Sequence, residues 1–109
     1  MADPTADSTI EVRDSVERSR WEVVVDGEVA GFADYTRDGD VVTVPHTEVS
    51  EEYAGRGLAK RLVAEMLDGL AAQGLRLVPQ CPLVRKQLAG DEAEHLDLVT
   101  PEARERYGL

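Results

Sequence analysis

The chain has 109 residues, enough to close one modest hydrophobic core but not to build a second domain. Acidic side chains outnumber basic ones by 22 to 12, and the formal net charge of -10 argues against nucleic acids and anionic lipids as partners. No apolar run approaches the roughly 20 residues of a membrane span, and the acidic N-terminus does not resemble a signal peptide. With one cysteine and two widely separated histidines, we expect a cytoplasmic protein with no disulfide, metal or membrane partner.

The N-terminal half predicts a tail followed by strands. Residues 1–15 are rich in Asp, Ser, Thr and Pro, so we expect a mobile tail there and a single domain over 16–109. Mixed β-branched, aromatic and polar residues then predict strands over about 20–25, 28–36 and 40–49. The dipeptides Asp26-Gly27 and Asp38-Gly39 are typical of hairpin turns. Together they predict an antiparallel meander.

The C-terminal half predicts a helix, a strand and two short helices. Apolar residues recur at helical spacing from about residue 56, and Gly74 is a reasonable C-terminal stop. A fourth long strand is expected over 75–81, and a short helix is expected from Pro82. A last short helix is expected after Thr100, whose side chain can cap it. The expected fold class is α/β (α+β), in which the meander leads into a β-α-β crossover and a short C-terminal helix.

Two glycines, Gly55 and Gly57, stand directly before the long helix. The first backbone N–H groups of a helix lack internal partners and the helix dipole is positive there, so a glycine-rich entry lets a phosphate approach closely. Residues 54–90 are also locally basic, with 6 basic and 2 acidic side chains. Two plainer interpretations stay open. The glycines can serve a tight turn with positive φ, and the basic residues can form a solvated helix face.

Known phosphate-loop motifs differ in how well they match. A dinucleotide fingerprint requires a third glycine where Lys60 stands, and no segment matches a P-loop. The stretch VSEEYAGRGLAKRL resembles the pyrophosphate-binding motif of GNAT acetyltransferases, Arg/Gln-x-x-Gly-x-Gly/Ala, although Glu52 stands where Arg or Gln is usual. With HTEV before it and LVPQCPLVRKQL after it, the chain over about 21–89 resembles the small stand-alone GNAT-like subfamily that includes animal N-acetyltransferase domain-containing proteins.

The resemblance implies acetyl-CoA as the ligand. In GNAT folds the pantetheine arm pairs with the backbone at the end of the fourth strand, which corresponds to about Glu48 and Val49. Basic side chains near the loop, of which Arg56, Lys60, Arg85 and Lys86 are candidates, would complement the phosphates. The amides implied to hold the pyrophosphate are those of Ala54, Gly55, Arg56, Gly57, Leu58 and Ala59.

Three residues are candidates for the chemistry. His46 and Glu48 share one strand face by the period of two, so either can accept an amine proton, although polar strand residues are commonly just exposed. In the resemblance, Cys81 falls at the open end of the acetyl slot, where a thiol can take the acetyl group transiently. The alternative for Cys81 is a small buried hydrophobe. The tyrosine that many GNAT enzymes place after this strand is absent until Tyr107.

The acceptor is less defined than the cofactor. Compared with larger GNAT enzymes, this short chain lacks the two helices that build much of the acceptor site, and its acidic surface favours a cationic amine such as a polyamine or a lysine side chain. The main hypothesis is an N-acetyltransferase. The alternative is a non-catalytic CoA or acetyl-CoA-binding module, and a ligand-free interaction domain would leave the glycine loop unexplained.

Overall fold

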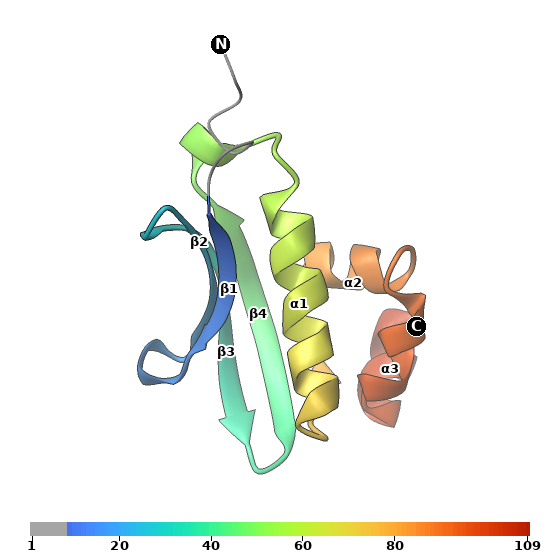
Figure 1. The fold of residues 1–109 in the computed structure, drawn as a ribbon. Coiled ribbons are helices and arrows are strands. Elements are labelled where there is room, and N and C mark those ends of the chain that lie inside the picture. Colours follow the sequence, from blue (N-terminus) through green and yellow to red (C-terminus); the bar gives the residue numbers. More distant parts are fainter. Residues whose placement is uncertain (1–8) are drawn as a thin grey trace.

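The computed structural model describes residues 9–109, so the part of the expected tail over 1–8 lies outside the described residues. A curved five-stranded sheet with strand order β1-β2-β3-β4-β5 carries the long helix α1 along one face, with the C-terminal helices on the same side (Figure 1). The strands are β1 (Ile10–Ser15), β2 (Arg20–Val25), β3 (Glu28–Asp38), β4 (Val41–Val49) and β5 (Arg76–Val78). The helices are α1 (Leu58–Ala72), α2 (Pro82–Leu88) and α3 (Pro101–Tyr107), with 3-10 segments at Val16–Arg18 (η1), Glu51–Tyr53 (η2) and Ala93–Leu98 (η3).

The expected tail over 1–15 is wrong for residues 10–15, because these form β1. This strand pairs antiparallel with β2 from Ile10↔Val25 to Ser15↔Arg20. Ile10 and Val12 are half-buried against the core, whereas Glu11 and Arg13 are exposed. Two apolar residues in a polar segment are too weak a signal to separate an edge strand from a tail.

The expected meander is confirmed, with β1 as an additional strand. Strands β2, β3 and β4 pair antiparallel in sequence order. Asp26 and Gly27 both have positive φ, 50° and 85°, as a tight two-residue hairpin turn requires. Asp26 is joined to β1 as well, because its N–H donates to the Thr9 carbonyl at 2.9 Å.

A bulge in β4 decides which side chains face the helices. Two residues of β4, Val44 and Pro45, stand opposite the single residue Tyr35 of β3. Before the bulge, Val42 and Val44 are buried; after it, the half-buried residues are odd-numbered. The bulge therefore shifts the inward-facing register of β4 by one residue.

Helix α1 covers the sheet with a continuous apolar stripe and begins at Leu58, two residues later than expected, because Gly57 is its N-cap with φ 73°. Gly69 lies where α1 crosses β2, and a Cβ atom there would collide with the Trp21 ring. The helix ends just before Gly74, whose φ of 71° confirms the expected stop. The buried residues of α1 are Leu58, Leu62, Val63, Met66, Leu67 and Leu70.

The expected long strand over 75–81 is wrong: β5 is only three residues long and pairs in parallel with the start of β4. Pro79 follows it and has no N–H to extend the ladder. The short helices are confirmed, since α2 begins at Pro82 and Thr100 Oγ1 accepts a hydrogen bond from the Ala103 N–H at 3.3 Å. Within residues 9–109, no helix combines the length and apolar character needed to cross a membrane.

Candidate functional site

Strands β4 and β5 part halfway along β4. Their pairing covers Val41↔Arg76 to Thr43↔Val78, and one more bond follows, from the Cys81 N–H to the Val44 carbonyl at 2.9 Å. From Pro45 onward, the described residues provide no backbone partner for β4 on the β5 side. The end of β4 therefore leaves an unpaired backbone edge beside α1 and α2.

The register identifies which backbone groups point into this gap. The Ser50 N–H donates to the Ala30 carbonyl at 2.8 Å, so even-numbered residues after the bulge direct their backbone groups toward β3. Thr47 and Val49 then direct their N–H and C=O groups toward the gap. The Thr47 hydroxyl is also buried, and no described residue hydrogen-bonds it. Buried polar groups are normally paired, so these groups fit a ligand that brings hydrogen-bonding amides between the strands.

The glycine loop joins this gap to α1. Gly55 and Gly57 have φ of 77° and 73°, so the plainer interpretation, a tight turn that requires positive φ, agrees with the structure and stands beside the phosphate-loop interpretation. No side chain caps α1, and its Leu58, Ala59 and Lys60 N–H groups have no backbone acceptor among the described residues. These donors, together with the positive end of the helix dipole, make the first turn of a 15-residue helix suitable for an anion.

A cleft of about 430 Å³ lies beside this turn, between α1 and α2. It is lined by Ala59 and Lys60 from α1, by residues of α2, and by Gly90 and Asp91 from the loop that follows. The Lys60 ammonium pairs with the Asp91 carboxylate, whose hydrogen bond and charge raise the pKa of Lys60. The residues contributed by α2 are Leu83, Lys86 and Gln87.

The four basic candidates for phosphate binding have different surroundings. Lys60 and Lys86 line the cleft, and Arg56 lies in the loop itself. Arg85 instead donates to the carbonyls of Pro79 and Gln80 at 3.3 and 2.9 Å, and its guanidinium stacks on the Tyr107 ring at 4.3 Å. Arg85 therefore holds α3 against the start of α2, and the structure does not bring it to the cleft.

His46 and Glu48 lie on one face of β4, as expected. Both are more than half exposed, and His46 Nε2 lies 3.5 Å from Glu48 Oε1. Phe32 packs edge-on against the His46 ring at 6.2 Å between centroids, and the Arg20 guanidinium stacks on the Phe32 ring at 4.6 Å. This pair lies on the sheet face that carries no helix.

Cys81 lies on the opposite side of the sheet from His46 and Glu48. It is the N-cap of α2, only 4% exposed, and its side chain belongs to the core cluster. The structure thus does not bring the three chemical candidates into one group. All three candidates lie near the gap between β4 and β5. The bond from Cys81 to Val44 closes the inner end of the gap, and His46 follows Val44 by two residues along β4.

Sequence reasoning missed Thr47 and Asp91 at this site. The orphaned hydroxyl of Thr47 depends on the β4 bulge, and Asp91 reaches Lys60 only through the turn after α2. No local sequence pattern predicts a role at this site for either residue.

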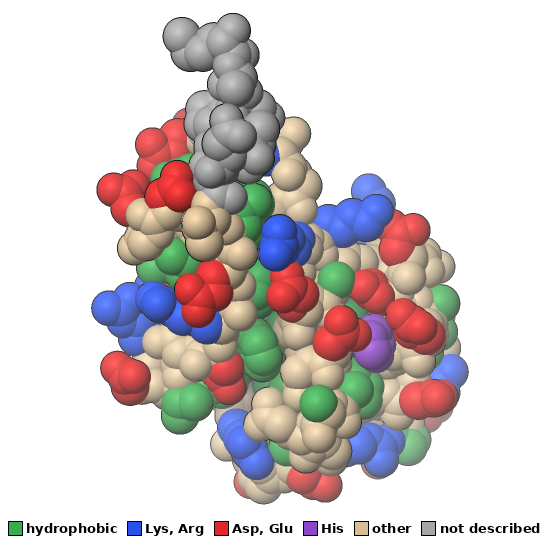
Figure 2. Space-filling view, in the orientation of Figure 1, with side chains coloured by type: hydrophobic (Ala, Val, Ile, Leu, Met, Phe, Trp, Pro, Cys, Tyr) green, Lys and Arg blue, Asp and Glu red, His purple; other side chains and the backbone are tan. Residues whose placement is uncertain are grey.

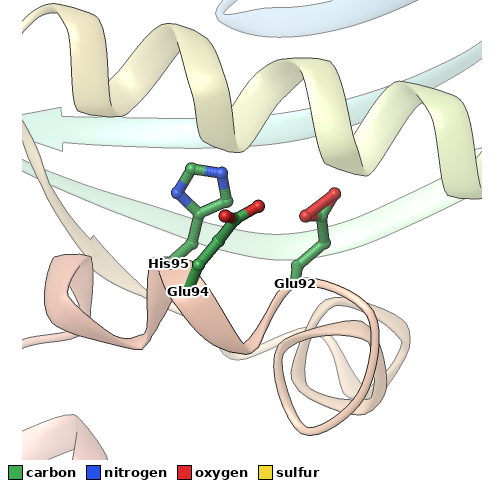
Figure 3. A group of neighbouring side chains, drawn as sticks. All are labelled: Glu92, Glu94 and His95. Carbon is green, nitrogen blue, oxygen red and sulfur yellow. The ribbon is translucent and has the colours of Figure 1, made fainter.

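A separate group of possible metal ligands, Glu92, Glu94 and His95, points from the η3 region toward α1 (Figure 3). Their ligand atoms lie within 4.8 Å of one another. His95 is mostly buried, and its Nε2 already lies 2.8 Å from Asp68 Oδ1. This contact joins η3 to α1 and engages the His95 nitrogen that a metal would need. The expectation that the protein binds no metal stays a prediction.

The family of the chain is shown by its sequence. A model of the GCN5-related N-acetyltransferases matches residues 20–98, and the chain belongs to that family. None of the curated proteins matches it.

Solved structures agree on the fold. A GCN5-like protein from Staphylococcus aureus superposes with a TM-score of 0.61 at 18% identity, over 83% of this chain and 87% of that one. The ribosomal-protein-S18-alanine N-acetyltransferase of Escherichia coli gives 0.53 at 18% identity, over 66% and 65%. The E. coli GNAT family N-acetyltransferase YhbS, solved in complex with CoA, gives 0.50 at 23% identity, over 72% and 65%. At these identities the likeness is one of fold.

Proposed function

We propose that this protein is an acetyl-CoA-dependent N-acetyltransferase that acts on a cationic amine. The observation that carries the proposal is the unpaired edge of β4, which leads directly into the uncapped first turn of α1. One end offers hydrogen bonds to an extended amide-bearing arm, and the other offers a site for phosphate. Membership of the GNAT family, with a neighbour solved in complex with CoA, supports the same ligand.

The proposed cofactor site uses backbone groups more than side chains. Thr47 and Val49 would hold the pantetheine arm, and the loop and first helical turn would hold the pyrophosphate. Acetyl-CoA supplies an acetyl group already activated as a thioester. The proposed loop residues are Ala54, Gly55, Arg56, Gly57, Leu58, Ala59 and Lys60.

An amine must lose a proton before it can attack, and His46 and Glu48 are the proposed acceptors of that proton. Their exposure on the helix-free face leaves them open to a substrate from that side, and the 3.5 Å contact between them lets either share the proton. Because the whole chain is strongly acidic, a polyamine or a lysine side chain is the favoured acceptor class.

Two routes for the acetyl group remain. In direct transfer, the amine nitrogen bonds to the acetyl carbon, the thioester C–S bond breaks, and the CoA thiolate takes a proton. In covalent transfer, the Cys81 thiolate first forms its own thioester as CoA leaves, and the amine then breaks that bond and restores the thiol. The burial of Cys81 favours direct transfer, whereas its place at the inner end of the gap supports the covalent route.

The test combines binding with turnover. Calorimetric titration with acetyl-CoA and with CoA should show saturable binding that Gly57→Val weakens. Gly39→Val is the matched control, since Gly39 also has positive φ and open space around it but lies in the β3–β4 turn. Release of free thiol with an amine acceptor would establish the enzyme. Binding without release would favour the alternative, a non-catalytic CoA-binding module, and absence of binding would overturn both.

Cys81→Ala then separates the two routes. Loss of turnover with unchanged acetyl-CoA binding would support covalent transfer, and intact turnover would exclude it. We also propose that the chain forms a single domain, expected over 16–109 and extended by β1 to residue 10, that it is located in the cytoplasm, and that it belongs to the animal-type subfamily.

A further inference from the structure

The cleft between α1 and α2 has an unusual charge pattern. Lys60 and Lys86 supply two positive charges, and Asp91 is the one acid among the described residues that line it. Leu83, which is 38% exposed, adds an apolar surface. The cleft is therefore amphipathic and locally basic on a chain whose net charge is strongly negative. Figure 2 shows one face of the molecule, on which acidic and basic side chains are interspersed.

Asp91 already forms an ion pair with one of the two lysines, Lys60. Its carboxylate pairs with the Lys60 ammonium, and the two side chains are 66% and 64% exposed. Exposed ion pairs contribute little net free energy, because water solvates both charges well. An anion that enters the cleft can therefore take over Lys60 at small cost.

The Lys60–Asp91 pair lies at the first turn of α1, which is the proposed phosphate site. The Gln87 side-chain amide donates to the Lys60 carbonyl at 2.8 Å, which fastens α2 to the start of α1. Ala59 and Lys60 line the cleft and also belong to the uncapped first turn. A phosphate bound to that turn would meet both the ammonium of Lys60 and the negative charge of Asp91.

We propose that Asp91 is a specificity-determining residue that competes with ligand phosphate for Lys60. In the free protein, Asp91 neutralises Lys60. When a phosphate group binds, Lys60 changes partner and the Asp91 carboxylate turns to solvent. A carboxylate carries one negative charge, whereas a terminal phosphate or a bridging pyrophosphate carries about two in total, so this competition rejects singly charged anions and favours ligands that carry such groups. The inference rests on the proposed function, because it assigns the selectivity of the same site.

Calorimetry with acetyl-CoA tests the competition. Asp91→Asn should tighten binding about two- to fivefold at low ionic strength, and added salt should reduce the gain. Asp97→Asn is the matched control, since it removes the same charge from an exposed position on η3. In a Lys60→Met background, Asp91→Asn should give a much smaller gain. No gain, or a gain equal to that of Asp97→Asn, would overturn the proposal.

Titration with dephospho-CoA, which lacks the 3′-phosphate, shows which phosphate of CoA contacts Lys60. If Lys60 meets the 3′-phosphate, the gain from Asp91→Asn should be confined to CoA and acetyl-CoA. If Lys60 contacts the pyrophosphate, Asp91→Asn should tighten the binding of dephospho-CoA by the same factor. Either result supports the competition.

Inorganic pyrophosphate separates this inference from the proposed function. If acetyl-CoA does not bind the wild-type protein, the proposed function fails, and the pyrophosphate titration alone then decides about Asp91. Tighter pyrophosphate binding by Asp91→Asn would still support the competition, and unchanged or undetectable binding would overturn it.

Discussion

Glu22 shows how a single residue stabilises the sheet face that carries no helix. Its side chain is fully buried, yet Arg20, Arg13 and Arg18 donate to it at 2.8, 3.2 and 3.3 Å. Burial alone would raise the pKa of Glu22, but the hydrogen bonds and charges of the three arginines outweigh it and lower the pKa. The arginines extend from three segments, so Glu22 fastens β1, η1 and β2 together.

We predict that Glu22→Gln lowers the free energy of unfolding by about 1–3 kcal/mol near pH 7, because charge-assisted hydrogen bonds are lost. A lowered folded-state pKa stabilises the protein above the unfolded value, and that contribution disappears as the pH falls through the folded value. Urea unfolding of both proteins at about pH 7 and about pH 3 should therefore show a smaller difference in acid. An equal difference at both pH values would contradict the assignment.

Tyr35 provides a second test at the scale of one residue. Its hydroxyl donates to Asp14 Oδ1 at 2.7 Å, and burial, followed by this carboxylate, raises the pKa of Tyr35 to about 12. Tyr35→Phe should cost about 1 kcal/mol at neutral pH. A raised folded-state pKa stabilises below the unfolded value of about 10, and the contribution is lost as the pH rises toward 12. When unfolding is measured from about pH 7 to pH 11, the difference in unfolding free energy between the wild type and Tyr35→Phe should stay constant at first and then become smaller.

At the scale of elements, the packing of α1 on β2 depends on Gly69. Glycine inside a helix costs up to about 1 kcal/mol relative to alanine, so its presence needs a packing reason. The Trp21 ring supplies it, because it fills the space of a Cβ atom at this position.

Gly69→Ala should destabilise the protein by about 1–2 kcal/mol, since overpacking against Trp21 outweighs the gain in helix propensity. Thermal unfolding measures the change. Gly90→Ala is the control, because its φ is not positive and its added Cβ meets only ordinary contacts; we expect its effect to lie within about 0.5 kcal/mol. A stabilised Gly69→Ala protein would show that Trp21 can move aside.

The short β5 has a larger consequence than its length suggests. Pro79 ends the ladder, the chain turns at Gln80, and Cys81 makes the last bond to β4 before α2 begins. A longer β5 would have paired with the end of β4 and closed the gap. The same proline that makes the strand shorter than expected therefore creates the candidate ligand site.

At the scale of the whole molecule, helices cover one face of the sheet and leave the other open. Arg20, Phe32, His46 and Glu48 occupy the open face of β2–β4, so charge and aromatic stacking replace an apolar layer. This arrangement keeps an uncovered sheet compatible with water and leaves His46 and Glu48 accessible.

The expectation that no metal is needed is also tested on the whole molecule. Because Asp68 already engages His95 Nε2, we predict that a chelator leaves the melting temperature unchanged and that added Zn²⁺ does not raise it. Stabilisation by stoichiometric Zn²⁺ would contradict this prediction. Its loss in Glu94→Gln would then assign the metal to the cluster in Figure 3.

Features that a few neighbouring residues encode could be predicted before the structure was known. Turn dipeptides, the apolar period of α1, the stop at Gly74, the capping by Thr100 and the proline at the start of α2 each act within one or two turns of chain, so the meander and the helices were predictable. The glycine loop belongs to this group, because its motif is contiguous.

Features that depend on distant partners could be seen only in the three-dimensional structure. Ile10 and Val12 became a strand because β2 was available to pair with them, and the Thr47 hydroxyl is buried with no hydrogen-bond partner among the described residues because the β4 bulge turns it inward. Lys60 met Asp91 because α2 folds back beside α1. Pairing across tens of residues leaves no local pattern in the chain, so these contacts, and the separation of Cys81 from His46 and Glu48, emerged only with the packed fold.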